Sequence, residues 1–138
     1  MNSYKLSDLT VGMTESFEVE ITEKMMDKFI DITGDVSPIH VSQSYAREHG
    51  FNGRVCHGML FGSMFSTMAG VYLPGEHCLL HSVETKFSSP VYPGDKLTVS
   101  AKITEINDTF KTVIIKGTIT NGDGKKVCKA TIQAGVRE

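Results

Sequence analysis

The chain has 138 residues, of which 40% are hydrophobic and 22% are charged, and its formal net charge is -2. This length and composition are typical of one globular domain, which we expect to extend over residues 1–138. The small negative charge provides no basic surface for nucleic acid or for an anionic membrane, so we expect neither as a partner.

The first half of the sequence predicts one strand followed by helices. We expect a strand at residues 15–21 and a helix at residues 22–33, capped by its first residue and ended by Gly34. Ser37, followed by proline, has the pattern of an N-cap before a new helical turn. Residues 42–49 predict a second short helix.

The segment at residues 58–75, GMLFGSMFSTMAGVYLPG, contains no charged residue. A membrane-spanning helix needs about 20 predominantly apolar residues, whereas this segment contains glycine, serine and threonine and stops at Pro74. We therefore predict a long helix inside a globular protein, with all sides of the helix buried. Small residues at every fourth position predict a stripe where strand backbone approaches closely, namely Gly58, Gly62, Ser66 and Gly70.

After residue 75 the sequence is rich in β-branched residues, and turn sequences separate four expected strands. These strands lie at residues 81–92, 95–106, 110–120 and 125–136. The turn sequence NGDG before the last strand is a strong hairpin signal. A four-stranded antiparallel meander around one apolar helix is the economical arrangement, so the sequence predicts an α+β hotdog fold.

Asp35 and His40, in the sequence GDVSPIH, are the first candidates for chemistry. The proline between them restricts the backbone, and an acid and an imidazole held together could exchange protons with one bound molecule. The structural alternative is that Asp35 ends one helix and His40 packs at the start of the next. The spacing alone favours that alternative, because paired acids also occur in structural networks.

Gly58, which follows His57, lies in the first turn of the expected central helix, where backbone N–H groups lack helical partners. A thioester carbonyl could bind there as charge develops on its oxygen; the alternative is a small residue that serves packing. Ser66, two turns later, either bonds to the carbonyl four residues back or donates to Asp35. No metal site is expected, because Asp35 and His40 offer two ligands and nothing nearby completes a set.

The remaining sequence features point to an intracellular protein without a bound cofactor. There is no glycine-rich phosphate loop, so no cofactor is expected. Cys56, Cys78 and Cys128 lack metal-binding or redox spacing, and we interpret them as free thiols in a reducing compartment. No signal peptide is visible at the N-terminus. We therefore expect the cytoplasm.

In combination, these motifs resemble the MaoC-like hydratase family, the (R)-specific enoyl-thioester hydratases. The segments that carry the resemblance follow in order along nearly the entire chain: GDVSPIH at 34–40, FNGRVCHGML at 51–60, Ser66 within GSMFST, LPG at 73–75 and KFSSPVYPGD at 86–95. One position departs from the family pattern, because members usually carry asparagine in place of Ser37. The two residues are nearly equivalent N-caps, so the exchange affects the expected substrate more than the reaction class.

The resemblance implies that Asp35 and His40 bind the water that adds across the double bond of a trans-2-enoyl thioester. It implies that the N–H of Gly58 binds the thioester carbonyl and that Ser66 orients the acid. Two further residues are expected to contact the substrate, His57 and Ser37. The resemblance also implies a homodimer with an acyl tunnel near the subunit interface, acting on thioesters of coenzyme A or acyl carrier protein. A hotdog acyl-CoA thioesterase and a non-catalytic acyl-thioester-binding subunit remain as alternatives.

Overall fold

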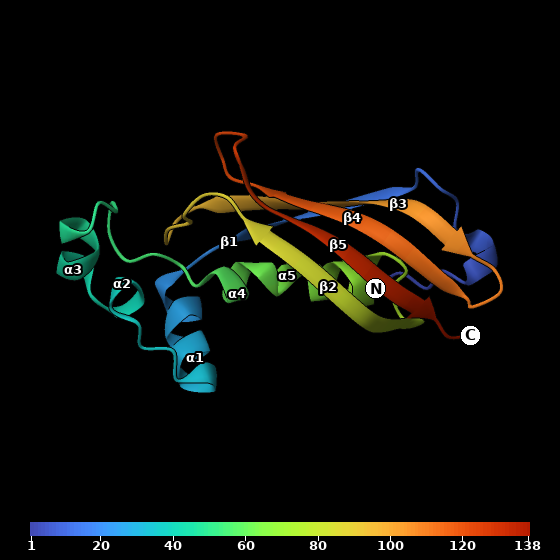
Figure 1. The fold of residues 1–138 in the computed structure, drawn as a ribbon, viewed down its shortest axis with the longest axis horizontal. Helices are drawn as coiled ribbons and strands as arrows, with labels where there is room; N and C mark the ends of the chain where they lie inside the picture. The colour runs from blue at the N-terminus through green and yellow to red at the C-terminus, as the bar shows by residue number, and fades with distance from the viewer.

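A computed structural model describes all 138 residues, and in it a five-stranded antiparallel sheet curves around a helical segment (Figure 1). The strands are β1 (Thr14–Glu20), β2 (Cys78–Phe87), β3 (Lys96–Asn107), β4 (Thr112–Thr120) and β5 (Lys126–Val136). The helices are the 3-10 turn η1 (Leu6–Asp8), α1 (Glu23–Thr33), α2 (Pro38–Val41), α3 (Gln43–Glu48), α4 (Gly58–Gly62), α5 (Met64–Thr67) and the π-helical turn η2 (Met68–Tyr72). The predicted α+β arrangement is confirmed.

The order of the strands, β1-β3-β4-β5-β2, corrects the predicted meander. Strands β3, β4 and β5 are consecutive neighbours, but β2 pairs with β5 at one edge and β1 pairs with β3 at the other. The segment at residues 88–95 contains Pro90 and Pro93, which cannot donate to a strand ladder. The chain therefore crosses from β2 at one edge to β3, which lies between β1 and β4, instead of turning back as a hairpin. The predicted NGDG hairpin does join β4 to β5, with Gly124 at a φ of 78°.

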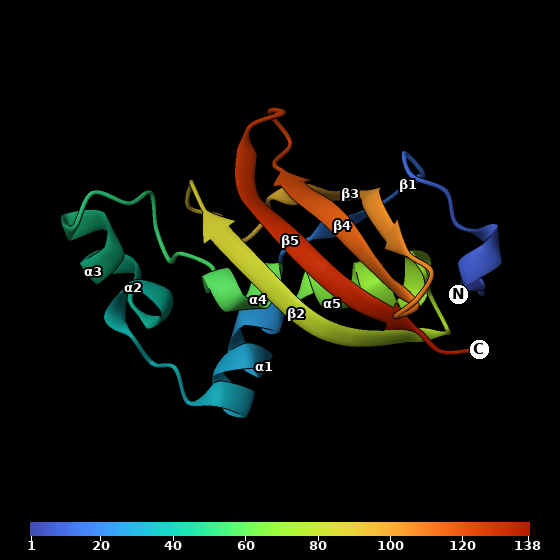
Figure 2. The same ribbon diagram turned by 45° about the vertical axis from the view of Figure 1, so that its right-hand side comes forward.

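The concave face of the sheet and the central helical segment enclose a core of 25 buried residues. Figure 2 shows β2 and β5 crossing this segment diagonally. Along β3 and β4, buried residues alternate with more exposed ones, as expected for strands with one face on a core. Gly117 on β4 allows the closest approach, because a Cβ at this position would overlap the ring of Phe65.

The central segment differs from the single helix that was predicted. It consists of α4, α5 and η2 and ends at Tyr72. The hydroxyl of Ser63 donates to the carbonyl of Leu60 at 2.5 Å, a bond that competes with regular helical pairing. Met59, Ser63 and Ser66 are exposed, so the prediction of burial on all sides is wrong. None of the helices combines the length and hydrophobicity needed to cross a membrane.

The stripe of small residues meets an aromatic side chain instead of strand backbone. A Cβ at Gly58 would lie 3.1 Å from the ring of Phe87, and one at Gly62 would lie 3.3 Å from the same ring. A Cβ at Gly70 would meet no atom within 4 Å, and Ser66 is exposed. A close neighbour therefore explains the small residue at only the first two positions.

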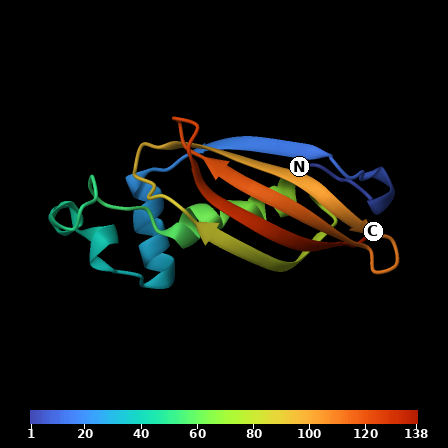
Figure 3. The same ribbon diagram turned by 45° about the horizontal axis from the view of Figure 1, so that its top comes forward.

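Helices α1, α2 and α3 project from one end of the sheet, and α1 lies beside the start of α4 (Figures 1 and 3). The hydroxyl of Thr22 accepts a hydrogen bond from the N–H of Met25 at 3.1 Å, and Gly34 ends α1 at a φ of 70°. Ser42 caps α3 in the same way, accepting from the N–H of Tyr45 at 3.1 Å. The predicted boundaries of α1 are confirmed, and α3 lies within the predicted residues 42–49, one residue shorter at each end.

Candidate active site

The segments GDVSPIH and FNGRVCHGML meet where the projecting helices join the central segment. One atom from each of Asp35, His40 and His57, a carboxylate oxygen and two ring nitrogens, lie within 4.8 Å of one another. Asp35 follows α1, His40 belongs to α2 and His57 directly precedes α4. Three separate elements therefore supply the cluster.

The carboxylate of Asp35 is held by Ser37. Its Oδ1 accepts a hydrogen bond from the hydroxyl of Ser37 at 2.6 Å and another from the N–H of Ser37 at 3.1 Å. These two bonds hold the pKa of Asp35 below its ordinary value, and the bond from the hydroxyl has the larger effect. His40 and His57 also lower this pKa, but by less. Ser37 occupies the predicted N-cap position of α2, but its side chain makes no capping bond. Its hydroxyl binds the acid instead.

The ring of His40 is fixed by a backbone carbonyl. Its Nδ1 lies 2.7 Å from the carbonyl oxygen of Val55. Since a carbonyl oxygen only accepts hydrogen bonds, Nδ1 carries the hydrogen, and Nε2 is left with a free lone pair. The tautomer therefore presents Nε2 of His40 as the nitrogen that can take up a proton.

Arg54 also helps to hold His40 in place, and this role was not predicted from the sequence. Its Nε donates to the backbone carbonyl of His40 at 2.8 Å, and its Nη2 lies 3.0 Å from Oδ1 of Asp27 on α1. Its side chain is only 16% exposed. The sequence contains one indication of this role, because Arg54 is the only cation in the otherwise uncharged loop FNGRVCHG. A single cation in such a loop favours a structural ion pair.

His57 lies beneath the acid and the imidazole. It is 2% exposed, and its Nε2 lies 3.1 Å from the backbone oxygen of Asp35. Its ring stacks on His40 with centroids 3.9 Å apart and planes 24° apart, and Phe29 approaches to 4.9 Å. This burial leaves the ring without an exposed face for the substrate contact that was expected.

The position of His57 also corrects the expectation that nothing near Asp35 and His40 completes a set of metal ligands. The lone pairs of an imidazole lie in the plane of the ring, and ligands of a metal must converge on one point. The rings of His40 and His57 are nearly parallel and stacked, so their lone pairs do not converge. This geometry suits stacking better than metal coordination.

Gly58 lies next to His40 in an open pocket of about 440 Å³. Its N–H has no hydrogen-bond acceptor within the chain. Most of the other walls are apolar, and they include Ile39, Val55, Phe61, Phe87 and Pro90. The pocket can hold an apolar chain with a carbonyl at the N–H of Gly58 and the imidazole of His40 alongside.

Ser66 is separated from this cluster. Its exposed side chain makes no hydrogen bond to Asp35, which is bound by Ser37 instead. It lines a second pocket, of about 390 Å³, together with Val83 of β2. Phe87 belongs to the walls of both pockets. Within the single chain, the predicted bond between Ser66 and Asp35 is therefore absent.

The chain is similar to proteins of known function. A 3-hydroxybutyryl-CoA dehydratase of Methylorubrum extorquens is 35% identical over 99 residues, which are 72% of this chain and 63% of that protein. An (R)-specific enoyl-CoA hydratase of Rhodospirillum rubrum is 31% identical over 113 residues, 82% of this chain and 78% of that protein. The chain thus spans less than two thirds of the first relative and more of the second.

Structural similarity extends over almost the whole chain. The unliganded R-hydratase of Pseudomonas aeruginosa superposes with a TM-score of 0.91 at 28% identity, covering 97% of this chain and 86% of that one. The sequence model of the family described as MaoC like domain matches residues 9–124. That range contains every candidate site residue. The chain therefore belongs to the MaoC-like domain family, with the hotdog fold.

Proposed function

We propose that this chain is an (R)-specific hydratase that interconverts trans-2-enoyl thioesters and (R)-3-hydroxyacyl thioesters by syn addition of water. The observation that carries the proposal is the pair of Asp35 and His40 held together next to the free N–H of Gly58. The dehydratase and hydratase functions named for the two relatives support it.

The acid and the imidazole are spaced to hold one water molecule. Their potential ligand atoms lie within 4.8 Å of each other. Two hydrogen bonds of about 2.8 Å each can bridge such a gap through one water. The carboxylate of Asp35, kept ionised by its lowered pKa, and the free Nε2 of His40 would both accept hydrogen bonds from this water.

The N–H of Gly58 would bind the carbonyl oxygen of the thioester. An enoyl thioester is electrophilic at C3 because its carbonyl takes up electron density as an enolate. An N–H without a protein acceptor is available to stabilise the charge that develops on this oxygen. Phe87 packs against Gly58 closely enough that a larger side chain would displace its ring.

Proton transfer then falls to Asp35 and His40 together. They would take a proton from the water as its oxygen attacks C3, and they would return a proton to C2. His40 lines the pocket and Asp35 lies beside His40, so one pair of groups would serve both additions, on the same face of the substrate. Dehydration is the same reaction in reverse, through the same transition state.

We also propose that the protein is a homodimer assembled along β2. This strand is an edge of the sheet, and it carries a row of exposed apolar side chains, Leu79, Leu80, Val83 and Phe87. Met59 on the neighbouring α4 is 69% exposed. A second copy would cover this apolar surface and enclose the pockets beside Gly58 and Ser66 as an acyl tunnel.

The proposed substrates are thioesters of coenzyme A or of acyl carrier protein. We place the protein in the cytoplasm and treat residues 1–138 as one functional domain. The free thiols of Cys56, Cys78 and Cys128 support a reducing compartment.

Incubation with crotonyl-CoA tests the proposed reaction directly. A hydratase removes the enoyl absorbance and releases no free thiol, and the product is (R)-3-hydroxybutyryl-CoA. Release of free coenzyme A instead would indicate a thioesterase, in which Asp35 would activate water towards the carbonyl carbon. Saturable binding of crotonyl-CoA without either change would indicate a non-catalytic subunit. The last two results would contradict the proposal.

A further inference from the structure

Apart from the cysteines, His57 is the only polar or charged side chain that is buried, at 2% exposure. It lies between two aromatic rings, with His40 stacked on it at 3.9 Å and Phe29 at 4.9 Å. Its position directly before Gly58 places it under the proposed site, beyond the reach of a substrate in the open pocket. The ring therefore contacts the proposed reacting groups from the buried side of the cluster.

The hydrogen bonding of His57 fixes its tautomer. Nε2 lies 3.1 Å from the backbone oxygen of Asp35, which can only accept, so Nε2 carries the hydrogen. Nδ1 is then a lone pair, and it is buried without any hydrogen-bond partner. Burying an unpaired polar atom is unfavourable, and an apolar ring of similar shape would avoid that penalty. Packing alone therefore does not account for a histidine at this position.

We propose that His57 is a positioning residue for the pair of Asp35 and His40. Its Nε2–H fixes the backbone at Asp35, and its ring face holds the imidazole of His40. In the proposed reaction, on which this inference rests, His40 carries positive charge whenever the shared proton resides on it. The π face of an uncharged ring stabilises a stacked cation. His57 thus acts on catalysis through its neighbours and does not bind the substrate.

Two substitutions separate the two contacts. His57→Gln keeps a donor near the position of Nε2 and removes the ring, whereas His57→Phe keeps a ring and removes the donor. We expect each variant to lower kcat for crotonyl-CoA by about tenfold or more, because small misplacements of reacting groups are costly. KM should change by less than about twofold, since only the transition state depends on this alignment. His57→Phe should remain folded because it removes the unpaired nitrogen.

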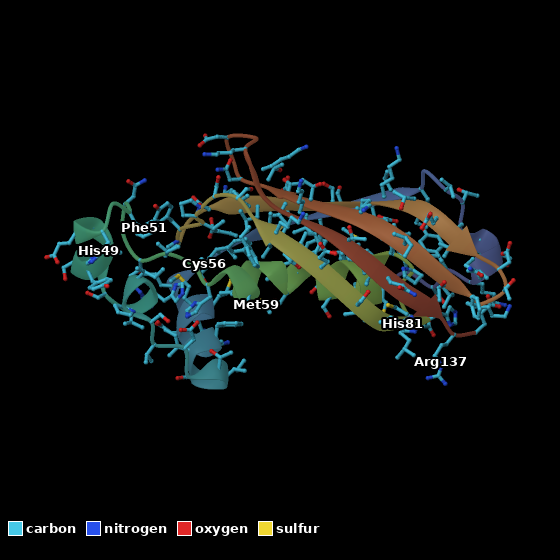
Figure 4. All side chains as sticks on the ribbon, in the orientation of Figure 1. His49, Phe51, Cys56, Met59, His81 and Arg137 are labelled. Atoms are coloured by element: carbon cyan, nitrogen blue, oxygen red, sulfur yellow. The ribbon has the colours of Figure 1, made fainter.

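His49→Gln is the matched control. His49 also stacks on an aromatic ring, that of Tyr45 at 3.9 Å, and its Nδ1 lies 2.8 Å from a backbone oxygen. It is exposed near α3, far from the central segment (Figure 4). Its substitution should leave kcat and KM unchanged. Folded His57 variants that both turn over at the wild-type rate would overturn the proposal, as would a rise in KM with kcat unchanged.

An NMR measurement tests the positioning without any turnover. The hydrogen on Nδ1 of His40, bonded to the carbonyl of Val55, should give a downfield ring-proton signal that exchanges slowly. We expect this signal in the wild type and in His57→Phe, and its loss in His57→Gln. A signal that persists in His57→Gln, or that is absent from the wild type, would contradict the positioning role. Failure of the wild type to hydrate crotonyl-CoA would contradict the proposed function alone.

Discussion

The carboxylate of Asp35 is oriented by a residue only two positions further along the chain. Ser37 donates both its N–H and its hydroxyl to the same oxygen, so the short turn holds the acid without any long-range contact. His40 is fixed differently, through the carbonyl of Val55 and through Arg54. The two proposed catalytic groups therefore depend on different parts of the sequence, one local and one distant.

Ser37→Ala should raise the pKa of Asp35 towards its ordinary value. A hydrogen bond to a carboxylate stabilises the charged form, so removing the hydroxyl makes protonation easier as the pH falls. The rise should be partial, because the backbone N–H of residue 37 remains. Titration of the Asp35 carboxyl carbon by NMR measures this change. Ser66→Ala is the matched control and should leave the midpoint unaltered; an equal rise in that variant would show that Ser66 binds the acid.

At the scale of elements, close contact between helix and sheet depends on a glycine of the strand. Gly117 on β4 leaves room for the ring of Phe65 on α5, where any Cβ would overlap the ring. Gly70 of η2 has no such neighbour. The two positions make a matched pair, since both are glycines of regular segments and only one is needed for packing.

Gly117→Ala should destabilise the protein by about 1–3 kcal/mol, as overpacking of a core does. Gly70→Ala should be neutral or stabilise by up to about 1 kcal/mol, because it restricts the unfolded chain without a new contact. Urea unfolding followed by circular dichroism measures both changes. A Gly117→Ala variant as stable as the wild type would mean that α5 can move away from the sheet without cost.

The sequence predicts those features of this fold that depend on neighbouring residues. The cap at Thr22 and the NGDG hairpin are set within a few residues, and both are present. The pairing of β2 with β5 depends on contacts between distant segments, so a meander was the wrong inference. The stacking of His57 on His40 is hidden for the same reason. The sequence has a serine at both position 37 and position 66, and it does not show which of the two hydroxyls reaches Asp35.

At the scale of the whole molecule, the sheet leaves β2 without a partner on one side. Apolar side chains of β2 and α4 are exposed next to both pockets. An edge strand of this length and hydrophobicity favours association with another chain. The proposed dimer would therefore complete the sheet and close the site in one step.

Val83→Glu should convert the proposed dimer into monomers, because it would bury a charge at the interface along β2. Val83 is 37% exposed in the single chain. Phe110→Glu is the control, since Phe110 is 78% exposed in the turn between β3 and β4 and does not belong to β2. Light scattering at micromolar concentration should give two chains for the wild type and for Phe110→Glu. A monomeric wild type would contradict the dimer and the shared tunnel.

The rate of crotonyl-CoA hydration in Asp35→Asn and His40→Ala tests the central claim most directly. General acid–base groups contribute about 10²–10⁴-fold to a rate, and we expect losses of that order in both variants. Asp31→Asn and His49→Ala, which change an exposed acid and an exposed histidine outside the site, should retain full activity. Circular dichroism should show that all four variants are folded. If either Asp35→Asn or His40→Ala kept more than about a tenth of the wild-type rate, that residue would not carry the proton transfer assigned to it.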